Sequence, residues 1–180
     1  MVAMILGTGF EPLEAVAPCD ILRRGGVEVK LAAIGDPLVE AGHGVRVQAD
    51  CTLAELDAAN LEMVILPGGL GGVQAIGASA AALALVREVY HAGGYVAAIC
   101  AGPTVLAKLG LLEGKQATCY PGCEGQMAGA LMQNAAVVRD GRIITGRAAG
   151  AAADFGLALL VALKGEQEAK RVADEIVYVR

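Results

Sequence analysis

The sequence predicts an α/β domain in which a mostly parallel sheet is covered by helices on both faces. Short apolar runs alternate with longer segments of helical periodicity, which is typical of repeated strand and helix units. Apolar residues make up 56% of the 180 residues and aromatic residues only 3%, so we expect a large core of aliphatic layers. The 25 glycines follow no three-residue period and therefore indicate tight turns. We expect one domain over residues 1–180.

The apolar runs are interpreted as strands, and the longer periodic segments as helices that end at glycines. Gly25 and Gly26 would end the first helix, and Gly110 the third. The expected strands are 2–6, 27–34, 63–66, 95–99 and 143–145. The expected helices are 13–24, 79–91, 103–109, 151–163 and 166–176.

Two segments fit this alternation less well. Residues 37–50 alternate polar and apolar side chains and are interpreted as a hairpin at one edge of the sheet. Residues 117–142 are rich in glycine and methionine. Within that region 116–119 is a candidate strand, and Asp140 and Gly141 form a candidate hairpin turn that would pair 135–139 with the chain from 143 onward.

Charge and hydropathy exclude several classes of protein. The formal net charge is −5 with both signs mixed along the chain, which argues against a surface for nucleic acid or anionic membranes. Residues 1–6 carry no basic residue before a short apolar stretch, so no signal peptide is expected. The longest apolar run, 148–163, contains Asp154 and is shorter than the roughly 20 residues needed to span a bilayer. We expect a soluble, cytoplasmic protein.

Cysteine and histidine usage limits the chemistry. An odd number of cysteines without a secretory signal argues against a full disulfide framework. His43 and His91, the only histidines, lie away from the expected active edge of the sheet, so no catalytic triad is indicated. Cys119 and Cys123 lack a second pair of metal ligands, and we expect no metal. The five cysteines are Cys19, Cys51, Cys100, Cys119 and Cys123.

Three segments should meet at the carboxyl ends of the strands, where open α/β sheets bind ligands. They are residues 7–14, 67–72 and 100–103, and each directly follows an expected strand. Cys100 would lie on a sharp bend between a buried strand and a helix, beside free N–H groups that favour a thiolate of lowered pKa. The alternative is that Cys100 is a small buried apolar residue.

Glu14 and two glycines complete this candidate site. Glu14 lies early in the first helix, where a carboxyl near a sulfur can donate or accept a proton, or can simply complement the helix dipole, as Glu11 can. Gly68 and Gly69 permit close backbone approach, so an N–H there and that of Ala101 would form an oxyanion hole, or else they are only turn glycines.

Four segments in order resemble the DJ-1/PfpI (ThiJ) family, and specifically its DJ-1 branch. They are residues 9–14, 66–69, 97–103 and 154–158, and the resemblance covers nearly the whole chain. It implies a flavodoxin-like, three-layer α/β/α sandwich of the class I glutamine amidotransferase-like type that forms a homodimer. In the family pattern Cys100 matches the elbow cysteine, Glu14 the protonated glutamic acid that hydrogen-bonds it, and Gly69 and Ala101 the N–H donors.

Two positions depart from the pattern. Tyr120 stands where the animal proteins have histidine, as in bacterial members, and this makes a peptidase less plausible. Residues 146–150 read Gly-Arg-Ala-Ala-Gly instead of Ser-Arg-Gly-Pro-Gly, although Arg147 is retained. We expect the substrate pocket to be formed by Tyr120, Gly68, Phe10, Leu70 and Arg147.

The resemblance implies a cofactor-independent glyoxalase III activity on methylglyoxal or glyoxal. Cys100 would form a hemithioacetal, Glu14 would move protons, and water would release lactate or glycolate. A related activity is deglycation of early glyoxal adducts. The alternative is a redox-responsive chaperone or oxidative-stress sensor in which Cys100 oxidises, with Cys119 as a candidate resolving thiol. A binding domain without chemistry is the third hypothesis.

Overall fold

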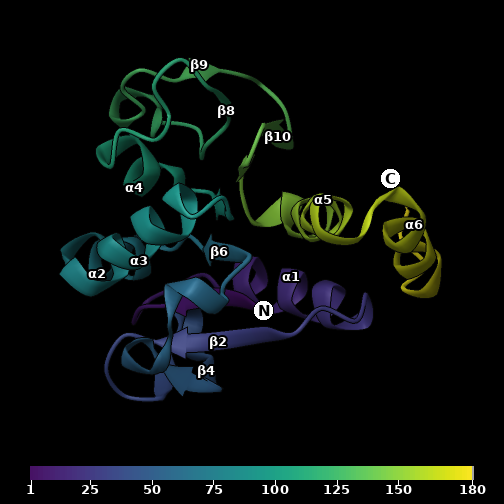
Figure 1. Ribbon diagram of the computed structural model, residues 1–180, viewed down its shortest axis with the longest axis horizontal. Coiled ribbons are helices and arrows are strands. Elements are labelled where there is room, and N and C mark those ends of the chain that lie inside the picture. Colours follow the sequence, from purple (N-terminus) through teal and green to yellow (C-terminus); the bar gives the residue numbers. More distant parts are fainter. Residues whose placement is uncertain (180) are drawn as a thin grey trace.

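The computed structural model, which describes residues 1–179, has a seven-stranded sheet between two layers of helices (Figure 1). The strand order is β10-β11-β7-β6-β1-β2-β5, and all neighbours are parallel except β10 with β11. The strands are β1 (Val2–Leu6), β2 (Val29–Ala33), β5 (Cys51–Thr52), β6 (Met63–Leu66), β7 (Tyr95–Ile99), β10 (Val137–Asp140) and β11 (Ile143–Gly146). The predicted mostly parallel α/β fold is confirmed.

Helices cover both faces of this sheet. In Figure 1, α2, α3 and α4 lie on one side and α1, α5 and α6 on the other. The helices are α1 (Pro12–Arg24), α2 (Leu70–Ala78), α3 (Ala80–His91), α4 (Pro103–Lys108), α5 (Ala152–Lys164) and α6 (Glu166–Glu175). Short 3₁₀ turns lie in the connections at Gly42–Gly44, Leu53–Glu55, Ala58–Asn60, Glu124–Gln126 and Ala149–Ala151.

Helix α2 was not predicted, because its glycines resemble a loop. A Cβ on Gly72 would lie 2.8 Å from Phe10 Cα, and one on Gly71 would lie 2.9 Å from Thr8 O. The glycines therefore allow α2 to pack directly on the loop that follows β1. This close approach of two backbones outweighs the low helix propensity of glycine.

The predicted hairpin at 37–50 exists, but its expected place at the edge of the main sheet was wrong. Strands β3 (Leu38–Glu40) and β4 (Arg46–Gln48) pair with each other in a separate sheet, and β5 forms the edge instead. The hairpin is tied to the loop after β1, where Gly9 N donates to Glu40 O at 2.7 Å and Gly42 N donates to Phe10 O at 2.8 Å.

The region from 116 to 146 contains two strand pairs. The predicted turn at Asp140 and Gly141 is confirmed, since β10 and β11 pair antiparallel with Asp140 opposite Ile143. The expected strand at 116–119 is shorter: β8 (Gln116–Ala117) pairs in parallel with β9 (Leu131–Met132) in a second small sheet.

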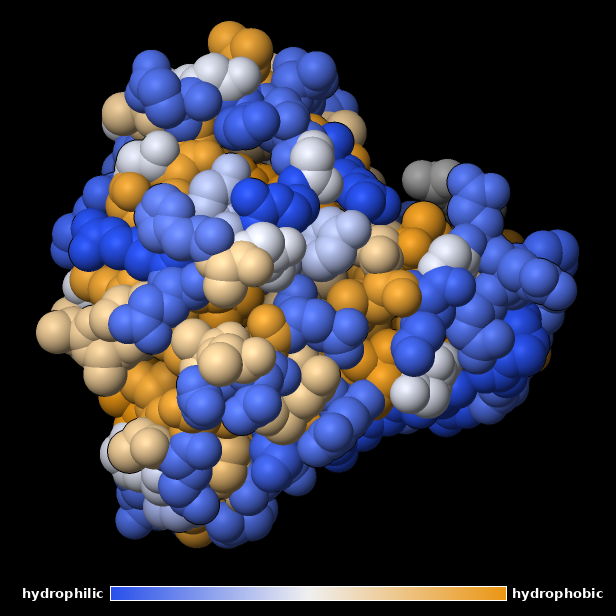
Figure 2. Space-filling model, viewed as in Figure 1, coloured by the Kyte–Doolittle hydropathy of each residue, from blue (hydrophilic) through white to orange (hydrophobic). Residues whose placement is uncertain are grey.

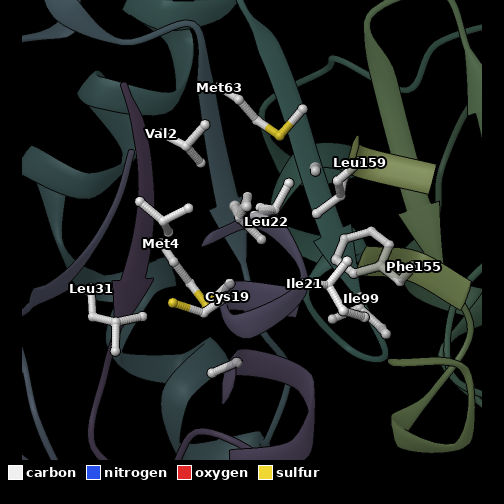
Figure 3. Packing of buried hydrophobic residues seen from close by; sticks show 14 of the residues in the cluster. Val2, Met4, Cys19, Ile21, Leu22, Leu31, Met63, Ile99, Phe155 and Leu159 are labelled. Atoms are coloured by element: carbon white, nitrogen blue, oxygen red, sulfur yellow. The ribbon is translucent and has the colours of Figure 1, made fainter. Parts of the chain in front are cut away.

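Side chains of the central strands alternate between two apolar clusters. Met4 and Ile99 belong to the cluster under α1 and α5, whereas Ile5 and Ala98 belong to the cluster under α2, α3 and α4. Figure 3 shows the first cluster, where Phe155 and Leu159 of α5 and Leu22 of α1 cover Met4 and Ile99. The two cores hold β1, β6 and β7 rigidly, and the loops after these three strands carry the candidate site.

The surface is polar at the α6 end of the molecule. Figure 2 shows mostly hydrophilic side chains there, at the end of the molecule where Figure 1 draws α6. Lys170 pairs with Asp174, and Arg171 pairs with Glu168 and Glu175. Within residues 1–179 no single helix is long and apolar enough to cross a membrane. Only α2 and α3 taken together reach that length and composition, and they bend by 82° at the break between them.

Candidate active site

Cys100 lies at the sharp turn between β7 and α4. Its φ of 65° is in the left-handed region, which costs a residue with a side chain about 1–2 kcal/mol. Two backbone hydrogen bonds from distant segments hold it: Cys100 N donates to Gly146 O at 3.0 Å, and Tyr120 N donates to Cys100 O at 2.8 Å. Gly102 N closes the turn onto Ile99 O at 2.9 Å. The surrounding fold therefore fixes the thiol at the carboxyl end of the sheet.

Glu14 and Glu11 have different environments, although both lie near the start of α1. Glu11 is the N-cap, and its Oε2 accepts a hydrogen bond from Glu14 N at 2.8 Å. The Glu14 side chain is fully buried, and its Oε2 accepts a hydrogen bond from Gly68 N at 2.9 Å. The role of complementing the exposed helix N-terminus thus falls to Glu11, while Glu14 points inward.

Gly68 lies between the thiol and the carboxyl. A Cβ at this position would lie 2.6 Å from Cys100 Cβ, 3.1 Å from Cys100 Sγ and against Glu14 Oε2. Both side chains therefore flank the same face of Gly68. The next residue, Gly69, has a φ of 84°, and a Cβ there would lie 2.6 Å from Glu11 N. Glycine is therefore required at both positions for the loops to pack this closely around the site.

Burial gives Glu14 an unusual affinity for a proton. Desolvation raises its pKa from 4.5 to about 7, against smaller lowering effects from the Cys100 side chain and the N–H groups of Gly68 and Ala149. Its second oxygen, Oε1, is buried without a well-formed hydrogen bond. This oxygen is available to carry a proton that moves during a reaction.

The sequence predicted a lowered pKa for Cys100, and this was wrong for a thiol that lies beside the ionised Glu14. Burial first, and then the charge of Glu14, raise the pKa of Cys100 to about 12, while the N–H groups of Ala101 and Gly69 act in the lowering direction. The two groups titrate as a pair, so between about pH 7 and pH 12 they hold one proton in common. Because the thiol has the higher pKa, this proton lies mainly on the Cys100 sulfur, while the N–H groups of Ala101 and Gly69 act toward the thiolate.

A small pocket opens above this pair. Its volume is about 240 Å³, below the roughly 300–1,000 Å³ typical of drug-sized ligands. Leu70, which is 76% exposed, and Tyr120, which is 49% exposed, stand at its rim. The lining residues are Glu11, Gly69, Leu70, Cys100, Ala101, Tyr120 and Cys123.

Three residues expected in the pocket lie elsewhere. Phe10 is fully buried, because α2 packs against it at Gly72. Arg147 lines a separate hollow of about 210 Å³ together with Cys119 and Glu124. Gly68 lies behind the thiol and is not part of the lining. Cys123 lines the pocket but was not predicted to do so. The signal for it was its place three residues after Tyr120, across a Pro-Gly pair that favours a tight turn.

A larger hollow lacks reactive side chains. It measures about 610 Å³ and lies between α2 and α4, where its lining includes Thr104, Lys108 and Gln126 but no thiol or carboxyl group. In the described part of the chain, no cluster of three or more histidine, cysteine or acidic side chains is arranged to hold a metal ion. The reactive groups therefore gather at the smaller pocket around Cys100.

A half-buried cysteine on a strained strand-to-helix turn, with a carboxyl that shares its proton, defines a class of α/β proteins with a nucleophile elbow. The sequence profile of the DJ-1/PfpI family matches residues 1–162, and the chain belongs to this family. The fold is accordingly flavodoxin-like, as predicted.

Known relatives agree with this membership. Protein dj-1beta of Drosophila melanogaster is 38% identical over 173 residues, which cover 94% of this chain and 92% of the relative. Its crystal structure superposes with a TM-score of 0.94 over 99% of this chain and 98% of that chain, at 36% identity. An oxidized DJ-1 from Toxoplasma gondii superposes with a TM-score of 0.95 at 31% identity, over 99% of this chain and 98% of that chain. Protein DJ-1 homolog B of Arabidopsis thaliana is 36% identical over 94% of this chain, which spans only 39% of that relative.

Proposed function

We propose that the protein is a cytoplasmic, cofactor-independent glyoxalase of the glyoxalase III type, which converts methylglyoxal to lactate and glyoxal to glycolate. One observation carries the proposal: the Cys100 thiol and the Glu14 carboxyl flank the same face of Gly68 beneath a small pocket. A two- or three-carbon dicarbonyl is an electrophile that needs both a nucleophile and a group that moves protons between adjacent carbons.

The first step is addition of the Cys100 thiolate to the aldehyde carbon, which gives a hemithioacetal. The N–H groups of Gly69 and Ala101 lie beside the sulfur, where they stabilise charge on the former carbonyl oxygen. Glu14 then takes the proton from the carbon that carries sulfur and returns it to the neighbouring carbon. This transfer converts the hemithioacetal to a thioester.

Water completes the reaction by hydrolysing the thioester. The hydroxy acid leaves, and the thiolate and the protonated Glu14 are restored. In sum, the dicarbonyl gains one water, so the conversion needs no external oxidant or reductant. Deglycation of early glyoxal adducts uses the same pair of groups and is the related activity that we propose to test alongside it.

Redox sensing or a redox-responsive chaperone activity is the second candidate function. It is favoured by a relative that was solved in an oxidized form and by the presence of a second thiol, Cys123, in the same pocket. A sensor requires oxidation of Cys100 but no proton transfer between substrate carbons. The two candidates therefore differ in their dependence on Glu14.

The test is methylglyoxal consumption without glutathione, with chiral detection of lactate. Wild type should form lactate, and both Cys100→Ala and Glu14→Gln should lose activity by about a hundredfold or more, because each removes a group that touches the reacting atoms. Glu88→Gln on the exposed surface of α3 is the matched control for loss of a carboxyl. An inactive wild type whose Cys100 still oxidises would reject the glyoxalase and favour the sensor.

We further propose that the protein acts as a homodimer. Large apolar side chains are exposed on α1 and on the neighbouring hairpin, namely Leu13, Val16, Leu38 and Val45. The hairpin is bonded to the loop that precedes α1, so these side chains come from neighbouring elements. An apolar patch of this kind marks an interaction surface. Sedimentation of wild type and Val16→Asp tests the proposal, which predicts that only the variant is monomeric.

A further inference from the structure

We propose that Cys123 is the resolving thiol of Cys100 and forms a reversible disulfide with it after peroxide oxidation. The inference rests on Cys100 being a reactive thiol but does not depend on glyoxalase turnover. Cys123 takes this role in place of Cys119, which had been suggested as the resolving thiol by its position beside Tyr120 in the sequence.

The five cysteines occupy very different positions relative to the pocket. Cys19 is buried in the core beside Met4 (Figure 3). Cys51 lies on β5, four strand spacings from β7, or about 19 Å at about 4.8 Å per spacing. Neither can reach Cys100 without unfolding of the sheet.

Cys119 is close in sequence to the pocket but faces away from it. It is only 2% exposed, and its thiol donates a hydrogen bond to Tyr120 O at 3.4 Å. It lines the separate hollow with Arg147 and Glu124. A thiol in this position is shielded both from Cys100 and from oxidants that enter the pocket.

Cys123, in contrast, lines the same 240 Å³ pocket as Cys100. Two consecutive hydrogen bonds connect them through the backbone: Tyr120 N donates to Cys100 O at 2.8 Å, and Cys123 N donates to Tyr120 O at 2.9 Å. The second bond closes a β-turn, so Tyr120 and Cys123 lie within about 7 Å of each other at Cα. Both thiols therefore face one small space.

The turn that carries Cys123 lies on the surface. Its central residues, Pro121 and Gly122, are exposed, and Gly122 has a φ of 98°. A disulfide needs its two Cα atoms about 4.4–6.8 Å apart. Movement of this exposed turn toward the fixed elbow of Cys100 brings the sulfurs together without disturbing the sheet.

The chemistry takes two balanced steps. The Cys100 thiolate attacks the O–O bond of a hydroperoxide, which gives a sulfenic acid and releases an alcohol, or water when the oxidant is hydrogen peroxide. The Cys123 sulfur then attacks the Cys100 sulfur. The S–O bond breaks, and the departing hydroxide combines with the proton of the Cys123 thiol to form water. The disulfide blocks further oxidation to the sulfinic acid and is reversed by a thiol reductant.

The experiment is intact-mass and peptide mass spectrometry after treatment with about two equivalents of hydrogen peroxide, because a sulfinic acid takes up two peroxide oxygens. Wild type should lose about 2 Da, with the Cys100 peptide linked to the Cys123 peptide, and dithiothreitol should restore it. Cys123→Ser should instead gain about 32 Da on Cys100, with about tenfold more sulfinic acid than wild type. Cys119→Ser is the matched control and should behave as wild type.

Three results would overturn the proposal. The first is sulfinic acid in wild type as fast as in Cys123→Ser. The second is a disulfide between Cys119 and Cys123. The third is accumulation of sulfinic acid in Cys119→Ser. Lactate formation, measured on the same untreated samples, reports separately on the proposed glyoxalase. Failure of one proposal is thus distinguishable from failure of the other.

Discussion

Replacing Glu14 by glutamine should remove most of the pH dependence of stability between pH 5 and pH 8. The glutamine keeps the size of the side chain and an oxygen that can accept the hydrogen bond from Gly68 N. It cannot ionise. The difference between wild type and variant therefore isolates the free energy of ionising one buried carboxyl.

The magnitude follows from the two pKa values of Glu14. Its pKa is about 7 in the folded protein against 4.5 for the ordinary carboxyl, so the folded state binds more protons between these values and stability falls as the pH rises. The stabilisation is fully present below pH 4.5 and is lost as the pH passes about 7. At about 1.4 kcal/mol per pH unit, the total is about 3.5 kcal/mol.

The assay is urea unfolding of both proteins at pH 5 and pH 8, at one protein concentration because dimerisation would shift the midpoint. Wild type should lose about 2.5 kcal/mol more than Glu14→Gln between the two pH values, because part of the total is already lost at pH 5. Glu88→Gln should lose as much as wild type. A difference between wild type and Glu14→Gln below about 0.5 kcal/mol, or of opposite sign, would refute the reasoning that burial governs this carboxyl.

Three further predictions concern local packing and strain. Gly68→Ala should separate Glu14 from Cys100, because its Cβ would lie 2.6 Å from Cys100 Cβ. The rate at which iodoacetamide alkylates Cys100 should then depend differently on pH. An unchanged pH profile would contradict the shared proton. Cys100→Gly should be more stable than Cys100→Ala by about 1 kcal/mol in urea, since glycine relieves the positive φ of 65°; the reverse order would mean that the turn is not strained. Gly156→Ala should lower stability by about 1–3 kcal/mol, because its Cβ would lie 2.9 Å from Ile21 Cδ1 between α5 and α1; an unchanged melting temperature would show that these helices can separate freely.

The sequence predicts the central elements well because their signals are local. The strand at 63–66 and the strand at 95–99 match β6 and β7 residue for residue, since continuous apolar runs reflect burial on both faces. Helix α2 could not be predicted, because its glycines serve a contact with Phe10 that only the folded structure creates. The placement of the 37–50 hairpin failed for the same reason, since distant backbone groups decide it.

Part of the candidate site could likewise be predicted from local sequence, and part could not. Cys100, Gly69 and Ala101 follow from two short segments that each come directly after an expected strand, and the structure gathers them at one pocket. Phe10 and Arg147 were placed wrongly, because the direction of a side chain in a loop depends on what packs against it. The pKa of Cys100 was also misjudged, because the N–H groups visible in the sequence pattern act against burial and the charge of Glu14.

The order of strands has a consequence for how the protein tolerates change. The reactive groups are supplied from the ends of β1, β6 and β7, which are consecutive neighbours in the middle of the sheet. Strands β5 and β10 form its two borders and supply none of them. Insertions, fusion partners or affinity tags placed at the β10–β11 turn or directly after β5 should leave the chemistry intact. These borders of the sheet can therefore change in sequence and length around an unaltered centre.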